Sequence, residues 1–224
     1  MDITKFTING KKAELYAASS EHRPLVVFNN HLESGDQIIQ TLREMNCPEF
    51  NFLCIGNLNW DHDLSPWHCP PIYKDDPPFT GGADEYLRLL LSEILPRSRE
   101  LIKGTPSKTC IAGYSLAGLF ALYALYKCDV FDRAASISGS LWFPDFKEFA
   151  LENSMKRLPD KIYLSLGDRE AKTKNQLLKT VQDNTEIIAE HYRALNIDVS
   201  FELNPGNHFK DAEIRSAKGI MAII

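Results

Sequence analysis

Short apolar segments with strand character recur along the chain, and segments with helical spacing separate them. A hairpin over residues 6–8 and 15–18, turned at Asn9-Gly10, comes first. The expected strands after it are residues 25–28, 52–55, 109–112, 134–137, 162–166 and 199–203, and the expected helices are residues 36–45, 83–100, 116–126, 173–195 and 211–223. Strands that alternate with helices favour a parallel sheet. We therefore predict a three-layer α/β fold, with a central mostly parallel sheet, an antiparallel N-terminal hairpin and helices on both faces.

The size and charge of the chain limit its organisation and its partners. Its 224 residues suit a single domain over residues 1–224 with a sizeable core. The net charge of -5, with Lys and Arg spread along the chain, argues against nucleic acid as a partner, because phosphate binding needs clustered positive charge. No stretch approaches the roughly 20 apolar residues of a membrane helix, and the first residues contain no apolar block of signal-peptide length. We expect a cytoplasmic protein without a membrane partner, and the sequence leaves a homodimer open.

Residues 57–82 form the one long segment without a regular pattern, rich in proline, tryptophan and histidine. A loop of that length in a compact domain is usually functional, so we expect it at the rim of a site. Trp60 and Trp67 would then offer apolar contact area to a substrate, or would only pin the loop to the body. Trp142, which follows the expected strand 134–137, is a further candidate for substrate contact.

The same segment and the cysteines raise the question of a metal site. Asp61, His62, Asp63, His68 and Cys69 lie near one another in sequence, but their spacing matches no recognised ligand pattern, and we expect neither a metal nor another cofactor. The chain has 5 cysteines in all, and they form no CxxC pair. An odd number of cysteines without such a pair favours reduced thiols. They are Cys47, Cys54, Cys69, Cys110 and Cys128.

The stretch TCIAGYSLAGLF, residues 109–120, places one serine between an expected strand and an expected helix. The residues that flank such a serine must be small, because the turn is so tight that larger side chains would collide. Gly113 precedes Ser115 by two residues, and Ala117 follows it by two, where the pattern G-x-S-x-G has glycine. The backbone N–H of Leu116, at the start of the helix, suits an oxyanion donor. Ser115 is thus a candidate nucleophile, although a serine that only caps the helix would leave the same pattern.

A serine nucleophile needs a base, and the base needs an acid that orients it. His208 follows the late strand 199–203 and is the candidate base. Two carboxylates, Asp168 and Glu170, follow the strand before it. Glu170 stands three residues beyond Gly167, a spacing frequent for the acid in this architecture, whereas Asp168 could instead accept hydrogen bonds from the backbone of the turn. We favour Glu170 and keep Asp168 as the alternative.

The segments AGYSLAGLFALYAL, SISGSLWF, YLSLGDRE and NPGNHF occur in the order seen in α/β-hydrolases. More narrowly, the chain resembles the esterase group that includes esterase D, feruloyl esterases and ferric-enterobactin esterases, and FTGGADEYLRLLLSEILPRSRE resembles the helix before that group's nucleophile strand. The resemblance covers nearly the whole chain from Leu25 onward. It implies an α/β-hydrolase fold, hydrolysis of an ester or related acyl bond, and no cofactor. By position, Ser115 matches the nucleophile, His208 the base and Glu170 the acid.

Two positions depart from that group's pattern. Ala117 stands at the fifth position of the serine motif, and FNNHLESG follows the first buried strand, where such enzymes often have His-Gly-Gly. The resemblance implies that the second oxyanion donor is a backbone N–H at Asn30 or His31. We assign the donor to Asn30 and place His31 among the substrate-binding residues.

These observations predict a serine hydrolase that cleaves a carboxylic ester of a small soluble molecule through an acyl-enzyme intermediate. Two alternatives stay open. The same triad could transfer the acyl group to another nucleophile in place of water, or the chain could be a non-catalytic ligand-binding protein that retains a hydrolase fold.

Overall fold

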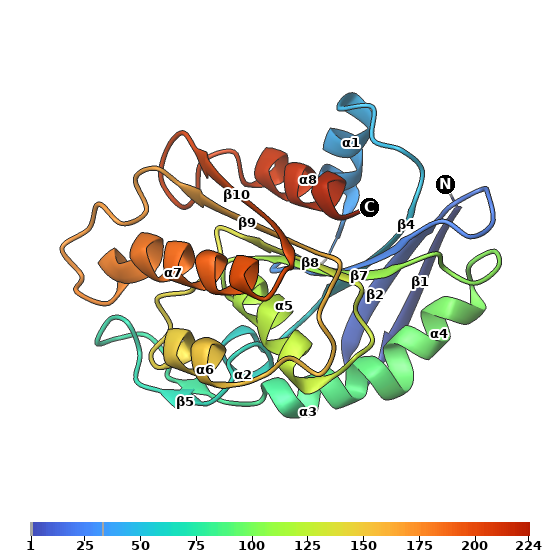
Figure 1. Ribbon diagram of the computed structural model, residues 1–224. Coiled ribbons are helices and arrows are strands. Elements are labelled where there is room, and N and C mark those ends of the chain that lie inside the picture. Colours follow the sequence, from blue (N-terminus) through green and yellow to red (C-terminus); the bar gives the residue numbers. More distant parts are fainter. Residues whose placement is uncertain (1, 33) are drawn as a thin grey trace.

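The computed structural model describes residues 2–32 and 34–224 and has the predicted α/β architecture (Figure 1). The strands are β1 (Asp2–Ile8), β2 (Lys11–Ala17), β3 (Leu25–Asn29), β4 (Asn51–Gly56), β5 (His68–Cys69), β6 (Phe79–Thr80), β7 (Thr109–Tyr114), β8 (Arg133–Ile137), β9 (Lys161–Gly167) and β10 (Asp198–Asn204). The helices are α1 (Asp36–Glu44), α2 (Trp60–Asp63), α3 (Ala83–Leu89), the π-helix η1 (Leu90–Ile94), α4 (Leu95–Glu100), α5 (Leu116–Lys127), α6 (Phe146–Glu152), the 3-10 helix η2 (Leu178–Thr180), α7 (Val181–Ala194) and α8 (Ala212–Ile223).

Eight strands form the central sheet, in the order β1-β2-β4-β3-β7-β8-β9-β10. The pairings β1–β2 and β2–β4 are antiparallel, and every pairing from β4 to β10 is parallel. The N-terminal hairpin is confirmed at its predicted turn, where Asn9 and Gly10 both have positive φ, as this type of tight turn requires. The fold class predicted from the alternation of strands and helices is therefore confirmed.

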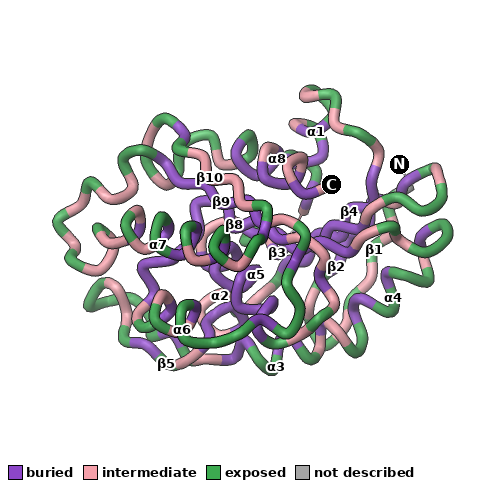
Figure 2. Tube along the Cα trace, viewed as in Figure 1, coloured by how far each residue is buried: buried purple, intermediate pink, exposed green. Residues whose placement is uncertain are grey.

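Side chains of the central strands alternate between two apolar cores, one on each face of the sheet. In β3, Val26 and Phe28 face the core beneath α1 and α8, whereas Leu25 and Val27 face the core beneath α5 and α7. Figure 1 shows α1 and α8 together on one side of the sheet and α3, α5, α6 and α7 on the other. Figure 2 shows that the middle strands are buried throughout, as expected for a sheet covered on both faces.

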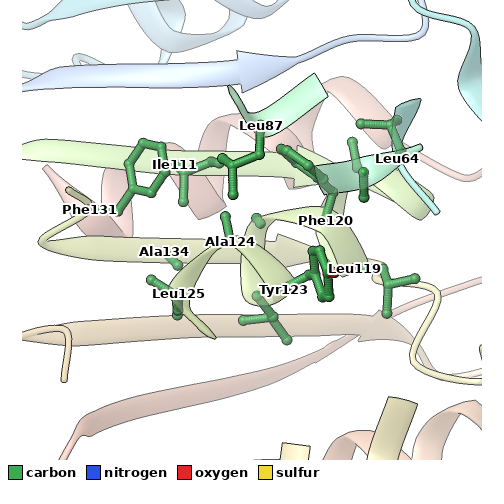
Figure 3. Packing of buried hydrophobic residues seen from close by; sticks show 14 of the residues in the cluster. Leu64, Leu87, Ile111, Leu119, Phe120, Tyr123, Ala124, Leu125, Phe131 and Ala134 are labelled. Atoms are coloured by element: carbon green, nitrogen blue, oxygen red, sulfur yellow. The ribbon is translucent and has the colours of Figure 1, made fainter. Parts of the chain in front are cut away.

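Helix α5 forms the centre of the larger core. All of its residues from Leu116 to Tyr126 are buried, so it is apolar on every side. Figure 3 shows Phe120 and Ala124 of this helix among Ile111 of β7 and Leu87 of α3. This packing fixes the start of α5 firmly against the end of β7, and Ser115 lies between the two elements.

Three segments differ from the sequence prediction. The expected helix 83–100 is interrupted by η1, and Pro96 stands in the first turn of α4, where a missing N–H is tolerated. The expected helix 173–195 begins only at Val181, because Oδ1 of Asn175 accepts hydrogen bonds from the amides of Leu177 and Leu178 and holds a turn there. The segment 57–82 contains α2 and the small antiparallel sheet of β5 and β6.

The parallel strands place their carboxyl ends at one edge of the sheet, where sites form in open α/β folds. The turns after β3, β7, β9 and β10 carry Asn30, Ser115, Glu170 and His208 respectively. No helix in the described ranges is long and apolar enough to cross a membrane.

Candidate active site

Ser115 lies at a strained turn between β7 and α5. Its φ of 59° and ψ of −122° fall outside the regions that side-chain-bearing residues favour, and its amide donates a 3.0 Å hydrogen bond to the carbonyl of Ile137. The side chain of Ser115 makes no capping hydrogen bond to α5. The interpretation of Ser115 as an ordinary helix cap is therefore wrong.

The turn explains which small residues the motif needs. A Cβ atom on Gly113 would lie 2.5 Å from the backbone and the Cβ of Ala117, so glycine is required at position 113. The methyl group of Ala117 fits because position 113 has no side chain. Ala117 is consequently compatible with the same turn that glycine forms at this position in the common motif.

His208 connects Ser115 to a carboxylate. Its Nε2 lies 3.0 Å from the Oγ of Ser115, and its Nδ1 lies 2.7 Å from Oε2 of Glu170. The side chain of Glu170 is only 5% exposed, whereas that of His208 is 27% exposed. The three side chains form a continuous hydrogen-bonded chain in the order that serine hydrolysis requires.

The structure distinguishes between the two candidate acids, Glu170 and Asp168. Glu170 makes the contact with His208, whereas Oδ1 of Asp168 accepts a 2.8 Å hydrogen bond from the amide of Gly206 and ties the turn after β9 to the turn after β10. Burial alone would raise the pKa of Glu170, but the hydrogen bond and charge of His208 and the amide of Gly167 together hold that pKa below its ordinary value. Glu170 is therefore an ionised partner for the imidazole.

A buried guanidinium supports the carboxylate from the other side. Arg215 of α8 is almost fully buried, and its Nη1 lies 3.3 Å from Oε1 of Glu170. The same nitrogen lies 3.2 Å from the hydroxyl of Ser138, and Nη2 donates to the carbonyl of Pro205 at 3.1 Å. Arg215 thus contacts the turns after β8, β9 and β10.

Arg215 was not among the site residues predicted from the sequence, although the sequence contains a signal for it. The buried face of α8 is otherwise formed by small and apolar residues and one serine, so an arginine on that face needs an internal partner. Ser140, which follows β8, is a direct neighbour of the nucleophile. Its hydroxyl lies 3.3 Å from that of Ser115, and its amide donates a 3.0 Å hydrogen bond to the carbonyl of Ser115.

The two predicted oxyanion donors differ in their hydrogen bonding. Within residues 2–32 and 34–224, the Leu116 amide has no acceptor. The Asn30 amide, in contrast, donates a 2.8 Å hydrogen bond to the carbonyl of Ile55, and its side-chain amide donates to the carbonyl of Ser34. The assignment of the second donor to Asn30 is therefore wrong, because the pairing of β3 with β4 continues one residue beyond the strand. The neighbouring amide of His31 has no acceptor in the described ranges.

Three of the four residues predicted to bind substrate line cavities beside Ser115. His31 and Trp60 line one cavity, with their rings 5.0 Å apart, and Trp142 lines another. Trp67 lines neither cavity. It packs edge-on against Phe143 and Phe149, and its Nε1 donates to the carbonyl of Pro144 at 3.1 Å. These contacts favour the alternative that Trp67 pins the segment 57–82 to the body.

Two of the residues considered for a metal site are engaged elsewhere. Asp63 pairs with Lys11, and Nδ1 of His62 lies 2.7 Å from the hydroxyl of Thr80. No three His, Cys, Asp or Glu side chains come together as a metal cluster in the described part of the chain. All five cysteines are free thiols.

Comparison with known proteins agrees with this architecture. The model of the Esterase family, described as "Putative esterase", matches residues 26–209. The uncharacterized protein YbbA of Bacillus subtilis (strain 168) is 25% identical over 192 residues, which cover 82% of this chain and 76% of that protein. Among solved structures, an IroE-like serine hydrolase from Shewanella oneidensis has a TM-score of 0.81 at 18% identity, over 99% of this chain and 79% of that one. The siderophore hydrolase EstA from Aspergillus nidulans has a TM-score of 0.77 at 19% identity, over 99% and 93%. At these identities the structures show a common fold.

Proposed function

The chain belongs to the Esterase family, and from that membership we propose that it hydrolyses a carboxylic ester of a small soluble molecule through an acyl-enzyme on Ser115. The observation that carries this proposal is the hydrogen-bonded chain from Ser115 through His208 to Glu170, at 3.0 Å and 2.7 Å. The position of Ser115 supports the proposal as well, because this serine lies on a strained turn that presents its hydroxyl at the edge of the sheet.

The first half of the reaction forms the acyl-enzyme. His208 Nε2 takes the proton of the Ser115 hydroxyl as the oxygen attacks the ester carbonyl. Glu170 holds the imidazole in the required orientation and stabilises the positive charge that it gains. The tetrahedral intermediate collapses, the bond to the alcohol breaks, and His208 returns its proton to the leaving oxygen.

The negative charge on the carbonyl oxygen needs backbone donors. The amide of Leu116 suits this role, since it stands at the start of α5 and has no acceptor in the described ranges. We assign the second donor to the amide of His31, which follows the occupied amide of Asn30. Two such donors typically contribute a rate factor of about 100 to 1,000 each.

The second half of the reaction releases the acid. Water attacks the acyl carbonyl while His208 takes one of its protons, and the second tetrahedral intermediate collapses to the carboxylic acid. The proton then passes from His208 to the oxygen of Ser115, which restores the free enzyme. Atoms and charges balance without a further co-reactant.

The proposal is tested by hydrolysis of p-nitrophenyl esters of increasing acyl length. We expect turnover by the native protein and loss of about 10,000-fold or more in kcat for Ser115→Ala. Ser92→Ala is the matched control, because this exposed serine lines neither cavity beside Ser115. Equal activity of the native protein and Ser115→Ala would overturn the proposal.

Trapping of the intermediate tests the acyl-enzyme itself. A fluorophosphonate should add its phosphonyl group to Ser115 of the native protein, and intact-protein mass spectrometry should detect one such group. Prior incubation with a slowly hydrolysed ester should block the label. Labelling at any other serine would contradict the assignment of the nucleophile.

A further inference from the structure

Two cavities meet at the proposed nucleophile. The first, which we call the α1–α8 pocket, has a volume of about 360 Å³ and lies between Trp60, Gln37 of α1 and Ser216 of α8. The second, which we call the Trp142 pocket, has a volume of about 300 Å³ and lies between Trp142, Tyr73 and Val181. Ser115 and His208 line both, so an ester bond at Ser115 would have one pocket on each side.

Apolar atoms form most of the surface of both pockets, and apolar side chains contribute much of it. Those of the α1–α8 pocket are Phe28, Leu32, Ile38, Trp60, Phe209 and Ala212. Those of the Trp142 pocket are Ile72, Tyr73, Trp142, Leu178, Val181 and Phe209. Each volume is at the lower end of the range for small-molecule sites, which suits one compact apolar group in each pocket.

The mouths of the pockets are also apolar. Leu32, Tyr73 and Phe209 are all more than half exposed, and Phe209 reaches 85%. Phe209 lines both pockets, and its ring lies edge-on at 5.1 Å from that of His208. Exposed apolar side chains gathered around a cavity mark a binding surface for an apolar ligand.

Among the residues that the structure describes, neither pocket offers a permanent cation. No lysine or arginine lines them within the described ranges. Arg215 of α8 is buried against Glu170 and lines neither pocket. The carboxylate of Glu170 is already engaged by His208, so the free acidic group among the described lining residues is Glu213, exposed on α8.

We propose that the substrate is an uncharged ester with an apolar group on each side of the ester bond, and this inference rests on the proposed hydrolase function. An anionic group in either pocket would lose its hydration without gaining a cationic partner, which is costly. In the α1–α8 pocket it would also lie near the carboxylate of Glu213. An apolar group instead gains free energy in proportion to the area that it buries.

The test compares matched neutral and anionic esters on each side of the bond. For the acyl side, the pair is p-nitrophenyl valerate and the p-nitrophenyl monoester of glutaric acid. For the alcohol side, the pair is phenyl butyrate and 4-carboxyphenyl butyrate. We expect kcat/KM to be at least about tenfold higher for the neutral member of both pairs, after correction for spontaneous hydrolysis.

Failure of this inference and failure of the hydrolase function give different results. If the anionic member of either pair is cleaved as well as the neutral one or better, the native protein is a hydrolase and the inference about charge is overturned. If no ester is turned over faster by the native protein than by Ser115→Ala, the hydrolase function itself fails, and the inference fails with it.

A charge reversal tests whether the α1–α8 pocket holds substrate. Glu213→Lys should reduce the neutral-to-anionic ratio at least about threefold for the pair whose variable half lies in that pocket. Glu152→Lys on α6 is the matched control, because this exposed glutamate lines neither pocket. If Glu213→Lys changes the ratio of neither pair, the assignment of the α1–α8 pocket to substrate is overturned.

Discussion

Nη1 of Arg215 lies 3.3 Å from Oε1 of Glu170, while Oε2 of the same carboxylate lies 2.7 Å from Nδ1 of His208. The amide of Gly167 donates to Oε1 as well, so the carboxylate is held at both oxygens. A carboxylate held in this way cannot rotate away from the imidazole. The position of Glu170 therefore depends on α8, an element far from it in sequence.

Replacement of Arg215 should lower kcat and leave KM nearly unchanged. Arg215→Met keeps the approximate side-chain volume but removes a charged hydrogen bond, which typically contributes about 1.5–3 kcal/mol and corresponds to a loss of about 10- to 150-fold. Arg215→Lys should recover part of the loss. Steady-state kinetics with one p-nitrophenyl ester measures both constants, and circular dichroism checks the fold.

A double-mutant cycle with Glu170→Gln separates this positioning role from a general effect on stability. If Arg215 acts through Glu170, Arg215→Met should cost much less activity in the Glu170→Gln background than in the native protein. Equal losses in both backgrounds would contradict the prediction.

The sequence predicted the architecture because the alternation of strands and helices reflects burial on both faces of a parallel sheet. Boundaries were less predictable where a side chain competes for backbone hydrogen bonds. The residues 173–180 have helical spacing, but Asn175 binds two amides and delays the start of α7. The spacing of apolar residues contains no information about that competition.

Within the site, local motifs were more informative than distant contacts. Ser115 is marked by its small neighbours, and His208 by its place after a late strand. Whether Trp60 or Trp67 lines a cavity depends instead on the side chains that approach them from α1, α5 and α6. These elements are distant in sequence, so the local sequence around the two tryptophans does not predict the difference. The same holds for Asn30, whose backbone amide donates a hydrogen bond to the carbonyl of Ile55 in the neighbouring strand β4.

The turn at Ser115 should tolerate glycine at position 117 but not alanine at position 113. Gly113→Ala would place a methyl group 2.5 Å from backbone atoms of Ala117, and relief of that contact must displace the start of α5. We expect about a 100-fold or greater loss of kcat/KM, because a shift of about 1 Å at a catalytic group has that effect. Ala117→Gly, the matched control, should retain activity and lose about 1 kcal/mol of stability. Full activity of Gly113→Ala would contradict this account of the turn.

Trp142 and Trp67 should respond differently to truncation. Trp142→Ala enlarges the Trp142 pocket and should change the relative kcat/KM of small and bulky esters by about 10-fold. Trp67→Ala should lower the free energy of unfolding by about 3–5 kcal/mol and leave that ratio unchanged, since Trp67 lines neither pocket. Denaturant unfolding and ester profiles of both variants measure these effects. A changed ester profile for Trp67→Ala would restore it as a substrate contact.

The five thiols should react slowly in the folded protein. Burial raises the pKa of Cys47 to about 11 and those of Cys54 and Cys110 to about 12, and it raises the pKa of Cys69 and Cys128 as well. The reactive thiolate is therefore scarce at pH 7.5. Ellman's reagent should titrate no thiol rapidly in the native protein and all five in denaturant without reductant. A lower number in denaturant would indicate a disulfide.

Protonation of Glu170 should weaken the fold at acidic pH. The pKa of Glu170 is lowered in the folded protein from its ordinary value of 4.5, mainly because His208 outweighs the effect of burial. A carboxylate with a lowered folded pKa contributes stability that is present above its unfolded pKa and is lost as the pH falls through its folded pKa. The free energy of unfolding of the native protein minus that of Glu170→Gln should therefore be largest above pH 4.5 and should shrink below it. Urea unfolding of both proteins between pH 7 and pH 3 measures this difference, with Glu152→Gln as the surface control. A difference that stays constant over this range would show that ionisation of Glu170 does not stabilise the folded state.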